Sequence, residues 1–150
     1  MTTKQMSNST FIPEIIKILN EGHTAIIPLK GNSMRPFLQD GRDKAKLQVA
    51  DTLTLKIGDV VLAELSPGRF VLHRIIALYN DDVTLLGDGN LSKEYCRRCD
   101  IKAKVTIFYR KSNCRQDSVL GAKWKIYSSI WMNLYPIRRY LLYLLKIIGY

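Results

Sequence analysis

Residues 60–76 read VVLAELSPGRFVLHRII, two apolar runs joined by the turn residues 66–68. Proline and glycine favour turns, and short apolar runs rich in valine and isoleucine favour strands. The stretch therefore predicts two antiparallel strands that form a β-hairpin.

Further short strands are expected on both sides of this hairpin. A second turn at 80–82 leads into the apolar run 83–86, and partly alternating runs lie upstream at 25–29 and 44–49. Short strands at such close spacing are typical of a compact antiparallel β domain and not of alternating βαβ units. The sequence thus predicts a mainly β fold.

Helices are expected only near the two ends of the chain. Residues 11–21 predict a short helix that Ser9 or Thr10 caps and Gly22 ends. Aromatic and apolar residues recur at helical spacing beyond residue 121, with an interruption at Pro136. We therefore divide the chain into a main domain, 1–120, and a basic, apolar helical tail, 121–150.

The positive charge of the chain belongs to its C-terminal third. The formal net charge is +10, and residues 101–150 hold ten Lys and Arg against Asp117 alone. The tail has three interpretations: it packs on the domain, lies on an anionic membrane surface with Trp124 and Trp131 at the interface, or binds nucleic acid. The apolar run 140–148 favours the first two over nucleic acid.

The sequence predicts a cytoplasmic protein that needs no metal or cofactor. It has no run of about 18 apolar residues that would span a membrane, and residues 1–7 lack a secretory apolar run. Cys96 and Cys99 have the spacing of half a zinc site and Cys114 offers a third ligand, but no fourth completes the set. Reduced structural thiols are the favoured interpretation.

Four short segments contain the candidate functional residues of the main domain. They are GNSMRPFL at 31–38, GDVV at 58–61, VLHRI at 71–75 and GDGN at 87–90. Any one of them alone is typical of a loop or a core strand. In this order they resemble the superfamily of signal peptidases and LexA-type self-cleaving repressors, over about residues 20–107.

The resemblance implies a compact LexA/signal-peptidase-like β domain and a serine peptidase mechanism. Ser33 matches the nucleophile, and His73 matches the base of the histidine branch, which includes endoplasmic-reticulum and archaeal signal peptidases. A serine hydroxyl needs a base to accept its proton, and histidine titrates in the useful range. Asp88 matches an aspartate near the site, and we expect it to orient His73.

The same resemblance indicates how a substrate is held. Gly31 occupies the position where some members add a hydroxyl to the oxyanion hole, so the backbone of Ser33 must supply the donor. We expect Gly31, Met34, Pro36 and Phe37 to contact an extended peptide that adds to a sheet edge, with small residues near the cleaved bond.

Two other functions remain open from the sequence. The domain is also consistent with a catalytically silent module that binds a leader or signal-like peptide in a maturation or export system. LexA-like self-cleavage is the third interpretation, although the residues before the first strand are too few for a helix-turn-helix domain.

Overall fold

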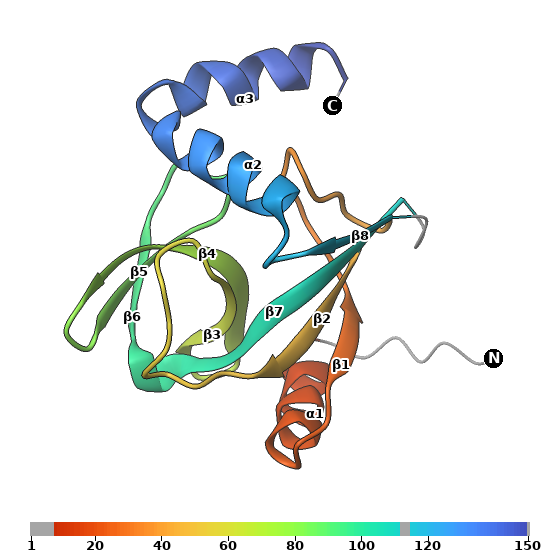
Figure 1. Cartoon of the computed structure of the whole chain (residues 1–150), viewed down its shortest axis with the longest axis vertical. Coiled ribbons are helices and arrows are strands. Elements are labelled where there is room, and N and C mark those ends of the chain that lie inside the picture. Colours follow the sequence, from red (N-terminus) through yellow and green to blue (C-terminus); the bar gives the residue numbers. More distant parts are fainter. Residues whose placement is uncertain (1–7, 112–114, 150) are drawn as a thin grey trace.

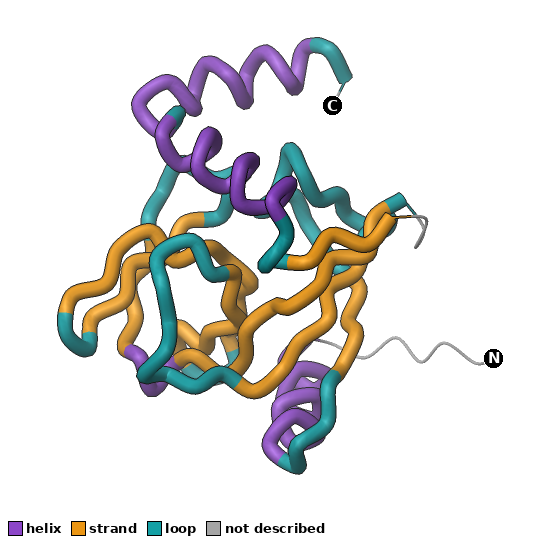
Figure 2. Tube along the Cα trace, in the orientation of Figure 1, coloured by secondary structure: helices purple, strands orange, loops and turns teal. Residues whose placement is uncertain are grey.

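The computed structural model describes residues 8–111 and 115–149 and confirms the mainly β prediction (Figures 1 and 2). The strands among these residues form one antiparallel sheet, in the order β1-β2-β7-β3-β4-β5-β6, with β8 paired to β7. Their bounds are β1 (Ala25–Pro28), β2 (Lys44–Val49), β3 (Val60–Ser66), β4 (Arg69–Tyr79), β5 (Asp82–Leu86), β6 (Glu94–Arg97), β7 (Ile101–Arg110) and β8 (Arg115–Ser118).

Helices lie at opposite ends of the curled sheet (Figure 1). The helix α1 (Asn8–Asn20) is at one end, and α2 (Ala122–Asn133) and α3 (Arg138–Ile147) are at the other. Two single 3₁₀ turns complete the structure, η1 (Arg98–Asp100) and η2 (Tyr135–Ile137). The helix α1 starts earlier than expected, so Ser9 and Thr10 lie inside it and do not precede it.

The predicted hairpin is β3 and β4. Val61 pairs with His73 and Val60 with Arg74, on either side of a tight turn that contains Gly68 at φ +79°. Glycine adopts this left-handed conformation without the strain that a Cβ would bring. The turn thus fixes the register that carries His73 into the sheet.

The strand β4 changes neighbours along its length. Arg69–Arg74 pairs with β3, whereas β5 pairs only from Arg74 to Tyr79. Within the described residues, the stretch 69–73 therefore has one edge without a strand partner. The strand β1 pairs only with β2 and also has a free edge. Both edges can accept backbone hydrogen bonds from an added strand.

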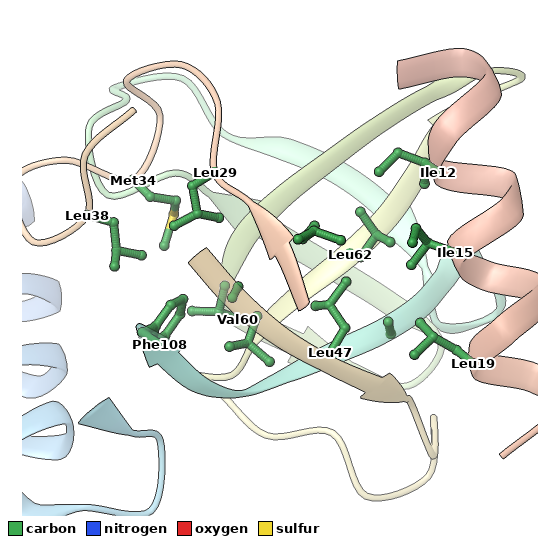
Figure 3. Close-up of a cluster of buried hydrophobic side chains, with 14 of the residues drawn as sticks. Ile12, Ile15, Leu19, Leu29, Met34, Leu38, Leu47, Val60, Leu62 and Phe108 are labelled. Atoms are coloured by element: carbon green, nitrogen blue, oxygen red, sulfur yellow. The ribbon is translucent and has the colours of Figure 1, made fainter. Parts of the chain in front are cut away.

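The main core lies between α1 and the curled sheet (Figure 3). Ile12, Ile15 and Leu19 recur on one face of α1 and point at Leu47 of β2 and Leu62 of β3. This spacing places them on one side of the helix. Burial of this apolar face accounts for the position of α1 across the sheet.

The helix α2 belongs to the same core. Trp124, Ser128 and Trp131 form its buried face, and the Trp124 ring lies 4.6 Å from that of Phe108 on β7. Of the three interpretations of the tail, packing on the domain therefore fits residues 122–133, because the Trp124 and Trp131 side chains are both buried and do not lie at a membrane interface. Residues 122–133 thus pack on the main domain.

Phe108→Ala is expected to destabilise the protein by about 3–5 kcal/mol, since it leaves a cavity between β7 and α2. Thermal unfolding should shift on the order of 10 °C lower. Leu53→Ala removes an exposed side chain and serves as the control, with a change within about 0.5 kcal/mol. Equal effects of the two substitutions would contradict this account of the core.

Candidate functional site

One pocket collects the two residues that the sequence selects for catalysis. It has a volume of about 520 Å³, and Ser33 and His73 both line it. Its walls come from β1 and the loop after it, from residues 70–73 of β4, and from Phe11 and Ile12 of α1. The pocket therefore opens between the two strand edges that lack partners.

Ser33 lies in the turn that follows β1, and the loop 87–90 holds its backbone. The Gly89 N–H donates to the Ser33 carbonyl at 2.8 Å. A Cβ on Gly87 would overlap the Ser33 carbonyl, and one on Gly89 would overlap the Asn32 carbonyl. The glycines of the GDGN segment thus let two backbones approach closely.

His73 is buried, and its two ring edges face different groups. A Cβ on Gly87 would lie 3.1 Å from His73 Cδ2, so the edge that carries Nε2 adjoins the loop that holds Ser33. On the other edge, Nδ1 lies 3.1 Å from Glu94 Oε2 on β6. The N–H of that contact is poorly aligned, and neither atom has another partner within the described residues. A small ring rotation would complete the bond.

Burial lowers the pKa of His73 below its ordinary value, while the nearby carboxylates of Glu94 and Asp88 oppose the shift. The ring is therefore neutral at neutral pH. A neutral imidazole with Nδ1–H directed at Glu94 leaves a lone pair on Nε2. That nitrogen is then able to accept a proton.

Asp88 does not have the predicted role of orienting His73. Its two carboxylate oxygens accept from Arg74 Nε and Nη2, each at 2.8 Å, and Oδ2 also accepts from the Tyr127 hydroxyl at 2.9 Å. Arg74 points to the opposite face of β4 from His73, because adjacent strand residues alternate. The carboxylate that touches His73 belongs to Glu94, which the sequence analysis missed.

The place of Glu94 follows from strand pairing. It starts β6 and pairs with Leu85 of β5, which in turn pairs with Ile75 of β4. The β4-β5-β6 meander thus places the start of β6 beside the middle of β4. No strand is predicted from the sequence at 94–97, and no motif marks the residue.

All four sequence segments converge through the buried Arg74 side chain and the loop 87–90. Arg74 Nη1 donates to the Gly58 carbonyl at 3.2 Å, which joins the GDVV and VLHRI segments. Its pair with Asp88 joins the GDGN segment, whose Gly89 holds Ser33. The four segments are separate in the sequence but are thus joined by hydrogen bonds in the structure.

The helix α2 adds hydrogen bonds to the network around Arg74 and Asp88. Ser128 Oγ accepts from Arg74 Nη1 at 2.6 Å, and Trp131 Nε1 donates to the Asp88 carbonyl at 2.9 Å. Burial alone would lower the pKa of Arg74, but its bonds to Asp88 raise it. Burial also raises the pKa of Tyr127, so its hydroxyl remains a donor. The charges of Arg74 and Asp88 are thus paired with each other and hydrogen-bonded to α2.

Gly31 and Met34 line the pocket, whereas Pro36 and Phe37 do not among the described residues. Phe37 stacks on Tyr127, with ring centroids 4.6 Å apart. The prediction that Phe37 contacts substrate is thus not supported by its position, since the aromatic surface of α2 covers it. Pro36 follows a cis peptide bond in the same turn.

The backbone conformation at position 31 favours glycine, whereas the space around it would admit a side chain. Its φ is +79°, nothing lies within 4 Å of a Cβ built on it, and its N–H donates to Asp40 Oδ1 at 2.8 Å. Within the described residues, the Ser33 N–H has no acceptor. The Ser33 N–H is therefore available for a further hydrogen bond.

The described residues contain no group of three or more His, Cys, Asp or Glu arranged to hold a metal ion. Cys96 and Cys99 are free thiols, and burial raises the pKa of Cys96 to about 11. Cys114 lies outside the described residues.

No family model matches the sequence, and no curated protein matches it. The interpretation of the pocket therefore depends on its geometry and on the sequence segments that form it.

Asp88→Asn is expected to destabilise the protein by about 3–5 kcal/mol, because the Arg74 charge would stay buried without its partner. Chemical denaturation measures the change. Asp81→Asn removes an exposed carboxylate 3.8 Å from Arg97 and should cost less than about 1 kcal/mol. A small effect of Asp88→Asn would show that the pair is not a central support.

Proposed function

We propose that the protein is a serine endopeptidase of signal-peptidase type that cleaves leader or signal-like peptides by a Ser33–His73 mechanism. The observation that carries the proposal is that the segments 31–38 and 71–75 line one pocket that Ser33 and His73 share, and that hydrogen bonds tie the other two segments to them. The resemblance to the histidine branch of signal peptidases supports the same assignment of roles.

In the proposed reaction, Ser33 Oγ attacks the scissile carbonyl carbon while His73 Nε2 takes the hydroxyl proton. The oxyanion that forms accepts from the Ser33 N–H, which has no other acceptor in the described structure. His73 then protonates the leaving amine as the peptide bond breaks. A water molecule then attacks the acyl-enzyme while His73 Nε2 takes its proton, and His73 returns that proton to Ser33 Oγ as the ester bond breaks and the acid product is released.

Glu94 has the position of the third member. A carboxylate on Nδ1 selects the tautomer with a free Nε2 lone pair and stabilises the imidazolium that forms during the reaction. Its distance of 3.1 Å is a hydrogen-bond distance, and catalytic hydrogen bonds often become well aligned only when substrate is bound. In this proposal Glu94 is a positioning residue.

The two free strand edges indicate how the substrate is bound. An extended peptide can pair with β1 on one side and with residues 69–73 of β4 on the other. Its carbonyl would then pass between Ser33 and His73. Alternate side chains would enter the apolar pocket lined by Leu29, Met34 and Leu72.

We also propose a cytoplasmic protein that works peripherally on the inner face of the membrane. No helix in the described part of the chain is long and apolar enough to cross a membrane. The concentration of basic residues after residue 100 matches the negative surface of the cytoplasmic leaflet.

Ser33→Ala is expected to lower cleavage of a pool of leader-type peptides by at least about 1,000-fold, with peptide binding retained. Mass spectrometry of the products measures cleavage. Ser129→Ala removes an exposed hydroxyl on α2 and should leave the rate unchanged. Equal peptide binding by the wild type and Ser33→Ala, with no product from either, would instead assign the chain to the peptide-binding modules.

The activity should fall at acid pH with a midpoint below 6.5, since protonation of His73 removes the base and burial lowers its pKa. Glu94→Gln removes a charge that raises this pKa, so the midpoint should shift lower still and kcat should fall. Glu64→Gln, on the neighbouring strand β3, is the matched control. A midpoint that Glu94→Gln leaves unchanged would exclude Glu94 as the partner of His73.

A further inference from the structure

The helix α3 exposes a large apolar surface on the outside of the molecule. Tyr140, Tyr143, Leu144, Ile147 and Ile148 are each between 56% and 73% exposed. Large apolar side chains are costly in water when they gather on one element. This set is called the outer face of α3 below.

The position of α3 explains why the domain does not cover this face. The helix α2 lies between α3 and the sheet (Figure 1). The face of α2 that is buried contacts the core, and the buried residue of α3 itself is Arg138, whose Nη2 donates to the Trp131 carbonyl. The outer face of α3 thus contributes nothing to the main core.

Positive charge borders this apolar surface, and negative charge is absent from the sequence around it. Residues 121–150 hold five Lys and Arg and no Asp or Glu. Arg139 and Lys146 are exposed on α3 itself, and Lys125 is exposed on α2. An occupant that contacts the outer face must therefore tolerate or favour basic neighbours.

We infer that the outer face of α3 docks on the surface of a membrane that contains anionic lipids. Its leucine and isoleucine side chains would enter the boundary between headgroups and acyl chains, and the two tyrosines would lie at headgroup level. Arg139 and Lys146 would contact lipid phosphates. A second copy of the chain fits less well, since it would bring two sets of basic residues together without an acidic partner.

This inference rests on the proposed membrane location but not on the peptidase chemistry. The site and the outer face of α3 lie on different parts of the molecule, with α2 between α3 and the network around Arg74. Ser33→Ala should therefore bind membranes as the wild type does. Loss of membrane binding should in turn leave cleavage of a short soluble peptide unchanged.

Vesicle sedimentation tests the inference with the full chain. The wild type should bind vesicles that contain phosphatidylglycerol, and bind phosphatidylcholine vesicles at least about tenfold more weakly. The variant with Leu144→Ser and Ile147→Ser should partition at least about tenfold more weakly. Leu53→Ser with Tyr79→Ser removes two exposed apolar side chains elsewhere and should have no effect.

Charge is tested in the same assay. Arg139→Gln with Lys146→Gln should lower binding to the anionic vesicles, and high salt should do the same. Lys44→Gln with Lys56→Gln, two exposed lysines far from α3 in the sequence, is the control. Circular dichroism and thermal unfolding of every variant report that the fold is intact.

Three results would overturn the inference. They are equal binding to both kinds of vesicle, equal loss in the α3 variants and their controls, and no vesicle binding by the wild type. A dimer that Leu144→Ser and Ile147→Ser dissociate, without vesicle binding, would assign the outer face of α3 to self-association.

Discussion

The buried ion pair between Arg74 and Asp88 connects every part of the structure on which the site depends. Both side chains are almost completely buried, and removal of either partner would leave an unpaired charge in the core. Arg74 follows His73 on β4, and Asp88 lies between the two glycines that hold the Ser33 turn. Tyr127, Ser128 and Trp131 of α2 complete the hydrogen bonds of the pair. The ion pair thus links the Ser33 turn, the strand that contains His73 and the helix α2.

Only a few contacts hold Ser33 and His73 in position. His73 lies in the middle of a strand, and Ser33 lies in a turn tied to a second loop by one backbone hydrogen bond. Such preorganisation lowers the cost of aligning the reacting groups. The buried charge that supports the site lies on the opposite face of β4 from the pocket. Burial of the His73 ring lowers its pKa and favours the neutral form.

The mainly β fold could be predicted because turns and apolar runs between residues 60 and 86 are local signals. Ser33 and His73 were found from segment order, and the structure brings them to one pocket. The role of Asp88 was predicted wrongly, since a sequence motif gives proximity but not the face of the strand to which a side chain points. Glu94 was not predicted, because its position beside His73 depends on the pairing of β4 with β5 and of β5 with β6. The sequence left packing and membrane contact both open for Trp124 and Trp131, because a basic aromatic helix has the same pattern on a core and on a membrane.

The central claim is that Ser33 and His73 act together as nucleophile and base. Acid-quenched turnover of leader-type peptides, followed by mass spectrometry of protein fragments, tests it most directly. The account predicts an acyl adduct on the fragment that contains Ser33, formed by the wild type and lost in His73→Ala. An adduct on a different residue, or product formation by Ser33→Ala at the wild-type rate, would contradict it.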